Sequence, residues 1–279
     1  MTVCIAALSD GDKSYTAVSD QMITLEGSGI VISSDSIDFK QGGIHQKWIA
    51  FYSGSSSLAV RILNEARETF RREPEKQISL REISEGFKDI YKRYLTEHVS
   101  DRILSPLGWE RDEFYRVGLT SLGESGFLQV RADFEYAMKN DPLLDFLVVG
   151  QASDGKMHLF SISNPGVLHY HDRHSFWAIG IGQSLALASL MFHGHRNLFD
   201  TASSIYHVLE AKFMAERAPG VGKSTVAVNV DFRTQYPFHA IFPDRVEEIR
   251  KIWEEKGKPR YPKEAKEKIR EWVPEVTEK

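Results

Sequence analysis

The chain has 279 residues, of which 42% are apolar and 27% charged, and its formal net charge is −4. This composition suits a globular protein with a sizeable core, and it offers no basic surplus for nucleic acid or an anionic membrane surface. The single cysteine, Cys4, excludes a disulfide framework and a cysteine-based zinc site within one chain. The N-terminus has no basic n-region, and no apolar run reaches the roughly eighteen residues of a membrane span. We therefore expect a cytoplasmic protein with no cofactor, metal, nucleic-acid partner or membrane partner.

The first part of the chain predicts four strands followed by two helices. Turn residues at 9–12 and a polar stretch at 24–37 interrupt the runs of strand-forming residues. The strands are expected at 2–8, 13–19, 38–44 and 47–53. Apolar residues then recur at helical spacing, which predicts helices at 58–72 and 79–99.

The second part repeats this order after an irregular segment. Residues 101–141 contain one short predicted helix, at about 130–138, and we interpret them as an insertion. Turn signals then divide strands expected at 145–150, 157–163, 167–171 and 176–179. Helices follow at about 183–194 and 198–216, and strands at 225–232 and 238–242. The tail, 243–279, is rich in Lys and Glu and predicts a charged helical C-terminal extension against the body or a neighbouring subunit.

This alternation of strands and helix pairs indicates the fold class. It favours an α+β protein in which sheets pack face to face with helices outside, over a doubly wound parallel fold. We predict a single domain over 2–242, interrupted by the insertion at about 101–141.

The N-terminus carries a candidate nucleophile. Removal of Met1 would leave Thr2 with a hydroxyl and a free α-amine. The amine, with a reference pKa of roughly 7.7–8.0, could accept the hydroxyl proton near neutral pH, whereas retention of Met1 would turn it into an amide. Threonine at position 2 is common, so the dipeptide gains its meaning from Asp20 and from Lys40, which lies fourteen positions before Gly54.

The element order and these residues resemble the N-terminal nucleophile (Ntn) hydrolases, most closely proteasome β-type subunits and their bacterial relatives. Residues 2–20 resemble the family's opening hairpin, in which the nucleophilic threonine begins the first strand and an aspartate ends the second. Residues 39–55 resemble the segment with the catalytic lysine and the oxyanion-hole glycine, and 177–188 resemble the Gly-x-Gly turn beside the nucleophile. The resemblance implies catalytic roles for Thr2, Asp20, Lys40 and Gly54 and a supporting turn at Gly180 and Gly182.

The resemblance also implies the layers, the reaction and the partners. The fold would be a four-layer αββα sandwich with two antiparallel sheets between helix layers. The reaction would be hydrolysis of peptide or amide bonds in a peptide or protein substrate, by a ring-shaped or stacked homo-oligomer that could work with an unfoldase. Tyr52, two residues before the oxyanion glycine, would line the substrate pocket with Ile23 and Ser56. A tyrosine there would leave room only for a small side chain, or close the pocket.

Three positions depart from the family pattern. Ile181 stands where the Gly-x-Gly turn usually has a serine. Ala218 and Val221 stand where an aspartate and a serine normally orient the threonine amine and a nearby water. The alternative to a threonine hydrolase is therefore a non-catalytic proteasome-like subunit with a structural, assembly or binding role.

Two other patterns are weaker. Residues 220–225 look like a phosphate-binding loop, but Arg217 stands where the pattern needs its first glycine, and the segment leads from a helix into a strand, the reverse of such a loop. Histidines cluster at positions 169, 171, 174, 193 and 195, yet no carboxylate or cysteine is spaced to complete a metal site. We interpret these histidines as surface residues near turns.

Overall fold

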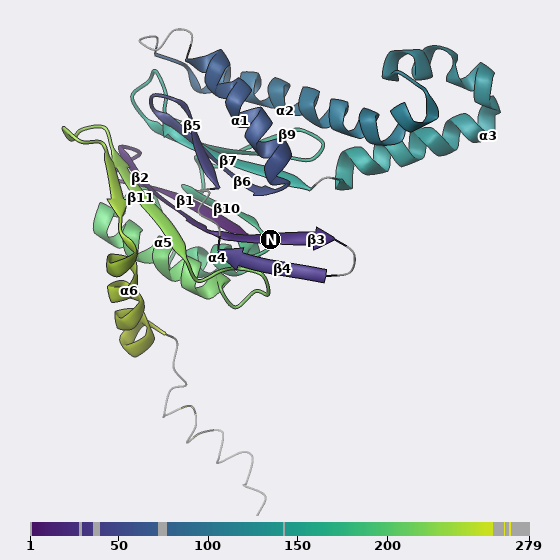
Figure 1. The fold of residues 1–279 in the computed structure, drawn as a ribbon. Helices are drawn as coiled ribbons and strands as arrows, with labels where there is room; N and C mark the ends of the chain where they lie inside the picture. Colours follow the sequence, from purple (N-terminus) through teal and green to yellow (C-terminus); the bar gives the residue numbers. More distant parts are fainter. Residues whose placement is uncertain are drawn as a thin grey trace, which may run out of the picture.

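The computed structural model describes residues 2–27, 30–35, 40–71, 77–141 and 143–258, together with 265 and 268; within 22–35 it describes only the course of the backbone. Two five-stranded antiparallel sheets pack face to face between layers of helices (Figure 1). The predicted α+β class and αββα sandwich are confirmed. No helix in these ranges has the length and apolarity needed to cross a membrane.

The first sheet begins with the N-terminus and has the strand order β10-β1-β2-β11-β12. Its strands are β1 (Val3–Ser9), β2 (Ser14–Asp20), β10 (Phe176–Gly180), β11 (Thr225–Asp231) and β12 (Phe238–Ile241). The second sheet runs β5-β6-β7-β8-β9 and consists of β5 (Gln41–His45), β6 (Trp48–Gly54), β7 (Leu144–Gln151), β8 (Met157–Ser163) and β9 (Val167–Tyr170). Every strand that the sequence predicted is present in these two sheets.

Strands of the first sheet contribute to two cores, because successive side chains of a strand point to opposite faces. In β1, Val3 and Ile5 pack toward the helices, whereas Cys4 and Leu8 face the second sheet. All seven residues of β1 are buried. Pairing with β10 on one side and β2 on the other fixes the register of β1, and with it the position of the residue that precedes the strand.

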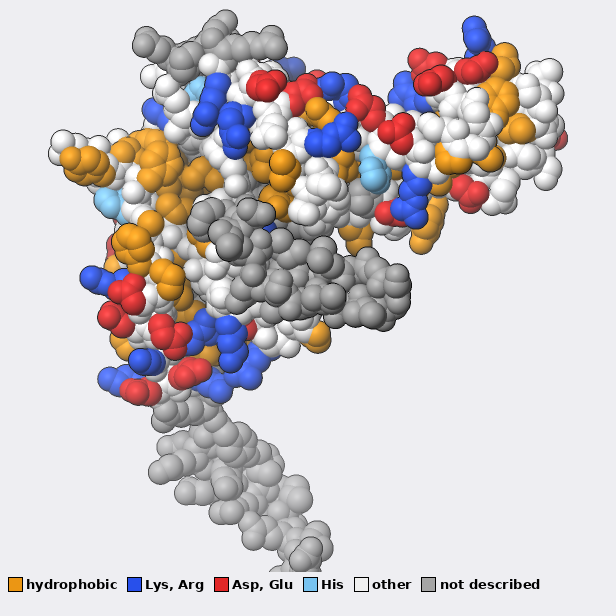
Figure 2. All heavy atoms as spheres, in the orientation of Figure 1, with side chains coloured by type: hydrophobic (Ala, Val, Ile, Leu, Met, Phe, Trp, Pro, Cys, Tyr) orange, Lys and Arg blue, Asp and Glu red, His pale blue; other side chains and the backbone are white. Residues whose placement is uncertain are grey.

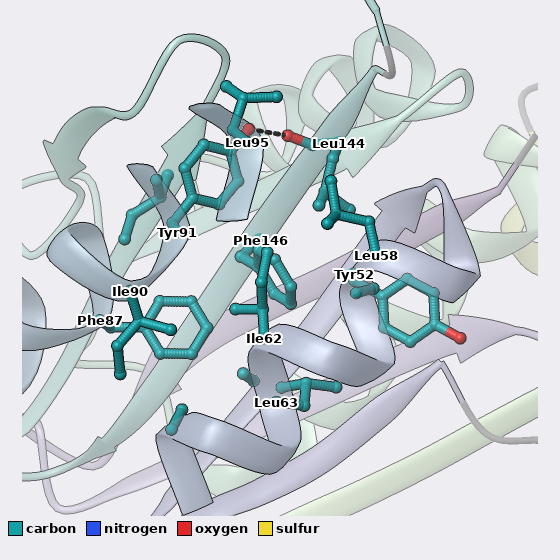
Figure 3. Close-up of a cluster of buried hydrophobic side chains, with 14 of the residues drawn as sticks. Tyr52, Leu58, Ile62, Leu63, Phe87, Ile90, Tyr91, Leu95, Leu144 and Phe146 are labelled. Carbon is teal, nitrogen blue, oxygen red and sulfur yellow. Dashed lines mark hydrogen bonds between the residues drawn. The ribbon is translucent and has the colours of Figure 1, made fainter. Parts of the chain in front are cut away.

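Each sheet is covered by a pair of helices on its outer face (Figure 1). The helices are α1 (Ser56–Phe70) and α2 (Leu80–Ile103) over the second sheet, and α4 (Gln183–Phe192) and α5 (Thr201–Ala215) over the first. Under α1 and α2, the ring of Phe146 lies 6.3 Å from that of Tyr52, 5.0 Å from that of Phe87 and 6.0 Å from that of Tyr91 (Figure 3). This aromatic cluster joins the second sheet to its helices.

The predicted insertion is a helical arm, α3 (Arg111–Asn140), that projects from the body (Figure 1). α3 breaks at Gly123, where φ is 69° and ψ is 170°, a conformation that glycine adopts without strain. The rings of Phe114 and Phe127 stack 5.0 Å apart across the break, so the two parts of the arm fold against each other. The sequence predicted only the helix at 130–138, because exposed hydrophobic side chains on the arm (Figure 2) obscure its apolar periodicity.

A two-stranded hairpin is the second difference from the sequence prediction. β3 (Met22–Gly27) and β4 (Ile30–Asp35) pair with each other, where a polar stretch without strands was expected at 24–37. The stretch mixes turn-forming serine, glycine and aspartate with strand-forming isoleucine and valine. Strand formation from such a mixture depends on the pairing partner more than on local preference.

The C-terminal tail packs on the body as far as the structure follows it. α6 (Pro243–Ile252) continues into a π-helical turn (Trp253–Gly257). Val246 and Trp253 are buried in the core under α5, and the Trp253 ring lies 5.4 Å from that of Phe213. The predicted domain boundary at 242 stays a prediction, and nearly all of 259–279 lies outside the described residues.

Candidate active site

Thr2, Asp20 and Lys40 meet at one end of the two sheets, because each lies at the end of a strand. Thr2 precedes β1, Asp20 is the last residue of β2, and Lys40 precedes β5. The antiparallel pairing of β1 with β2 places Cys4 opposite Ser19, so the start of β1 lies beside the end of β2. Lys40 comes from the second sheet, and the three residues therefore link both sheets.

The Lys40 ammonium contacts both of the other side chains. Its Nζ donates to Thr2 Oγ1 over 2.6 Å and to Asp20 Oδ1 over 3.2 Å, and the Thr2 hydroxyl donates to Asp20 Oδ1. The side chains of Lys40 and Asp20 are 7% and 0% exposed, so water screens their charges little. A cation this close to the hydroxyl oxygen favours its deprotonated form.

Backbone amides fix the orientation of the Asp20 carboxylate. Oδ1 accepts the N–H of Val3 over 3.1 Å, and Oδ2 accepts the N–H of Gly222 over 2.9 Å. Hydrogen bonds to a charged acceptor are roughly twice as strong as neutral ones. Both oxygens of this buried group therefore have partners, one of them from the loop between α5 and β11.

Gly54 ends β6, close to the segment that carries Lys40. The Tyr52 N–H donates to the Lys40 carbonyl over 3.1 Å and joins the two ends of the β5–β6 hairpin. Gly54 has a φ of 109°, and a Cβ there would lie 1.9 Å from the carbonyl oxygen of Leu143. The backbone thus requires glycine at this position whatever its N–H binds, and the oxyanion role stays a prediction.

The Gly-x-Gly turn lies directly against the Thr2 backbone. Gly180 has a φ of 92°, and a Cβ there would lie 2.3 Å from the Thr2 carbonyl oxygen. The Gly182 N–H donates to the same oxygen over 3.4 Å, and a Cβ on Gly182 would lie 3.0 Å from the Val221 side chain. Both glycines therefore allow β10 and α4 to approach the candidate nucleophile, and their supporting role stays a prediction.

The three predicted pocket residues lie on different elements. Tyr52 is 5% exposed and packs against Phe146 in the core under α1 and α2 (Figure 3). Ser56 is exposed in the first turn of α1, and Ile23 lies in β3, where its side chain is outside the described residues. The predicted substrate pocket therefore stays a prediction.

The loop on the other side of Thr2 presents apolar side chains. Val221 is 7% exposed and lies against Gly182, and Ala218 packs on the core under α4 and α5. Ile181, which belongs to the Gly-x-Gly turn and not to this loop, is 50% exposed and faces solvent. The loop reaches the site through the backbone of Gly222, whose N–H binds Asp20.

Thr2, the candidate nucleophile, is buried while the chain still carries Met1. Thr2 is 1% exposed and Lys40 is 6% exposed. Cys4 lies nearby, and its thiol donates to the Tyr52 carbonyl over 3.4 Å. Burial, together with the charge of Asp20, raises the pKa of the Cys4 thiol. Cys4 is thus a protonated core residue and does not compete as a nucleophile.

Gly222 is a candidate site residue that the sequence did not predict, because 220–225 look only like an imperfect phosphate-binding loop. The segment leaves α5 and enters β11, as predicted, and on the way its backbone binds Asp20. A signal is present in the sequence, since the resemblance matches Val221 to a residue beside the threonine amine. A glycine next to that position can bring its N–H close to the site.

The interpretation of the histidines as surface residues is wrong for two of them. His171 is 4% exposed, with its Nε2 2.8 Å from Ser161 Oγ and its ring stacked 4.0 Å from Trp177. His195 is 3% exposed, and its Nε2 donates to the Leu8 carbonyl over 3.1 Å. Both rings pack into cores that only the tertiary fold creates. Within the described ranges, no group of His, Cys, Asp or Glu is arranged to hold a metal ion.

Comparison with known proteins gives the fold. No protein-family model matches the chain, and no curated protein sequence matches it. Among solved structures, Anbu (ancestral beta-subunit) from Yersinia bercovieri matches with a TM-score of 0.61 at 14% identity, over 99% of this chain and 99% of that chain. At this identity the likeness shows the fold alone. The chain therefore shares the fold of that protein over 99% of its residues.

Proposed function

We propose that the chain is a proteasome-like N-terminal threonine hydrolase that cleaves peptide or amide bonds with Thr2 after removal of Met1. The observation that carries this proposal is the contact of one hydroxyl with both charged partners: Lys40 Nζ donates to Thr2 Oγ1 over 2.6 Å, and that hydroxyl donates to Asp20. If Lys40 were an ordinary solvated lysine and Asp20 an ordinary turn aspartate, the two side chains would not be expected to contact the same buried hydroxyl.

Loss of Met1 would supply the base. The free amine of Thr2 has a reference pKa of roughly 7.7–8.0, so a large part of it is neutral near pH 7 to 8. The neutral amine then accepts the hydroxyl proton, directly or through a water, as Oγ1 attacks the substrate carbonyl. Asp20 holds Lys40 beside the oxygen that becomes negative.

The remaining steps follow from acyl transfer. The Gly54 N–H stabilises the oxyanion, an effect of roughly 3–4 kcal/mol for one well-placed donor. The protonated amine returns its proton to the leaving amine, and the acyl ester on Thr2 remains. Water, activated by the same amine, hydrolyses this ester and regenerates the hydroxyl.

A non-catalytic subunit is the second candidate function, and specific observations favour it. Tyr52 is buried in the core where the predicted pocket would lie, and Val221 offers no polar group to the amine. A subunit of this kind would keep Lys40 and Asp20 as a buried ion pair that joins the two sheets. Its Thr2 would remain unreactive whether or not Met1 is removed.

We also propose that the chain forms a ring-shaped or stacked homo-oligomer in the cytoplasm, with peptides or proteins as substrates. Exposed apolar side chains at and after the end of α4 support a subunit contact: Met191 is 61% exposed, Phe192 83% and Leu198 79%. Apolar groups gathered in this way commonly mark protein interfaces. An unfoldase partner belongs to the same proposal, because a folded protein substrate would have to be unfolded to enter a ring or stack of subunits.

Intact mass and covalent labelling test the enzyme proposal. The chain from its native host should lack Met1, and a peptide epoxyketone, which captures both the hydroxyl and the amine of an N-terminal threonine, should label it once. Thr2→Ala should abolish labelling. Thr16→Val, which removes a buried hydroxyl from the same sheet, should label like the wild type. A retained Met1, or labelling that survives Thr2→Ala, would exclude this mechanism.

A further inference from the structure

Lys212 is a fully buried cation outside the three-residue cluster. It lies on α5, which packs against the first sheet, and it is 0% exposed. Its Nζ donates to the Gly222 carbonyl over 2.7 Å and to Glu216 Oε1 over 2.6 Å. Burial of an ammonium group is expensive without such partners, so a lysine at this position requires both contacts.

Arg250 of α6 holds the acidic partner in place. Its Nη1 donates to Glu216 Oε2 over 2.7 Å, and its Nη2 donates to Glu216 Oε1 over 2.8 Å. The guanidinium lies 4.2 Å from the centroid of the Phe213 ring. A bidentate arginine fixes the plane of a carboxylate as well as its position. The outer face of α6, in contrast, carries interspersed positive and negative side chains (Figure 2).

Gly222 connects this network to the candidate active site. Its carbonyl accepts from Lys212, and its N–H donates to Asp20 Oδ2 over 2.9 Å. One residue is thus held from both sides, by a buried cation and by a buried carboxylate. A continuous path of hydrogen bonds therefore runs from α6 through Glu216, Lys212 and Gly222 to Asp20.

The charges along this path act on each other. Burial lowers the pKa of Lys212, and the neighbouring Glu216 and the charge of Asp20 oppose that shift. Val221, the preceding residue of the loop, packs through its apolar side chain. The Gly222 N–H and carbonyl belong to adjacent peptide groups joined at the Gly222 Cα, so the contact of Lys212 with the carbonyl restrains the residue whose N–H binds Asp20.

We propose that Lys212 is a positioning residue for the threonine site: by holding the Gly222 carbonyl, it directs the Gly222 N–H at Asp20 and so keeps Asp20 in place beside Thr2 and Lys40. Glu216 and Arg250 hold Lys212 in turn. The effect on Thr2 reactivity rests on the proposed hydrolase function, whereas the effect on Gly222 does not. α6 thus belongs to the support of the site, although it touches neither Thr2 nor a reacting atom.

Two measurements on the full-length chain without Met1 test this role. The first is amide hydrogen exchange at Gly222, which needs no activity, and the second is the rate of labelling by the peptide epoxyketone. Lys212→Met keeps the length of the side chain and removes its charge, and it should speed Gly222 exchange and slow labelling by about tenfold each. Lys212→Arg should restore most of both.

Matched variants separate positioning from packing. Glu210→Gln changes another buried charge on α5, which pairs with His193 over 2.8 Å, and it should leave both readouts unchanged. Arg250→Gln loosens Glu216 from outside and should move both readouts in the same direction by about threefold, which keeps the test open if Lys212→Met does not fold.

The outcomes distinguish the two proposals. Unchanged Gly222 exchange in folded Lys212→Met, or in Arg250→Gln if the former does not fold, overturns the positioning role whatever the activity. Faster exchange with an unchanged labelling rate also overturns it. A mature wild-type chain that is never labelled overturns the hydrolase proposal, and the exchange data then decide alone whether Lys212 positions Gly222.

Discussion

The two sides of Thr2 are built differently. On one side, the charged side chains of Lys40 and Asp20 contact the hydroxyl directly. On the other side, Val221 and Ala218 are apolar, and the loop contributes the backbone N–H of Gly222 through Asp20. The groups that would tune the hydroxyl are therefore in place, whereas the side chains that would orient the amine are not. Changes on the charged side should therefore alter the reactivity of the Thr2 hydroxyl, whereas changes on the apolar side should alter proton transfer to the Thr2 amine.

Among the changes proposed, removal of the Lys40 charge should lower the labelling rate of Thr2 the most. Lys40→Met keeps much of the side-chain volume but leaves Thr2 Oγ1 and Asp20 without their cation, so labelling by the epoxyketone should slow by about 100- to 1,000-fold. The rate is measured by intact mass over time. Lys47→Met is the control, because Lys47 lies in the same hairpin and donates to Gln151 instead. Equal rates in both variants would mean that the polar side of Thr2 is structural.

The fold was largely predictable, because its strands are defined by local patterns. The hairpin of β1 and β2 turns at Asp10, Gly11 and Asp12, all with positive φ values, and these residue types favour that conformation. α3 was not predictable, because its halves pack on each other across Gly123 and leave much of the arm exposed. β3 and β4 were missed for a similar reason, since their pairing is not encoded in either strand alone.

The candidate site divides in the same way. Thr2, Asp20 and Lys40 could be named from the sequence because residues 2–20 and 39–55 resemble the opening hairpin and the lysine segment of the Ntn hydrolases. Lys212 could not, because its role depends on where the end of α5 meets the loop that binds Asp20. A buried lysine looks like any helical lysine until its neighbours are known.

Substitution of Tyr52 should change the access of bulky substrates to the site, with a smaller effect on the labelling rate than the loss of the Lys40 charge. We expect weak cleavage, if any, after large hydrophobic residues in the wild type. Tyr52→Ala should raise labelling by an epoxyketone with a bulky aromatic side chain about tenfold over the wild type, while costing roughly 3–5 kcal/mol of stability. Tyr52→Phe, which keeps the ring, should leave the preference unchanged. Rapid cleavage of bulky aromatic peptides by the wild type would contradict this interpretation of Tyr52.

The apolar side of Thr2 can be changed at Val221 with little change of shape. Val221→Thr adds one hydroxyl beside the Gly-x-Gly turn, and it should raise the labelling rate about threefold if the amine lacks polar support. Burial of the new hydroxyl should cost about 1–3 kcal/mol unless it finds a partner. The matched control is Val226→Thr, which makes the same change on β11, after the loop that carries Val221. A slower rate in Val221→Thr alone would show that the apolar contact itself positions Thr2.

Asp145 tests whether the site extends to a third side, and here we expect the smallest effect on reactivity. Asp145 lies opposite Ser53, one residue before Gly54, and burial raises the pKa of its carboxyl to about 6. Because this pKa lies above its value in the unfolded chain, ionisation of Asp145 costs stability, and the cost grows as the pH rises from about 4 to about 6. Asp145→Asn should therefore stabilise the protein by about 2 kcal/mol at pH 7, and by almost nothing at pH 4. Denaturant unfolding at both pH values measures this difference, with the exposed Asp133→Asn as the control for charge.

The labelling rate of Asp145→Asn should stay within about twofold of the wild type, because Asp145 makes no hydrogen bond to Thr2, Asp20 or Lys40 among the described contacts. A large loss of labelling in Asp145→Asn would instead place this carboxylate in the site, as a polar group beside Ser53 and Gly54.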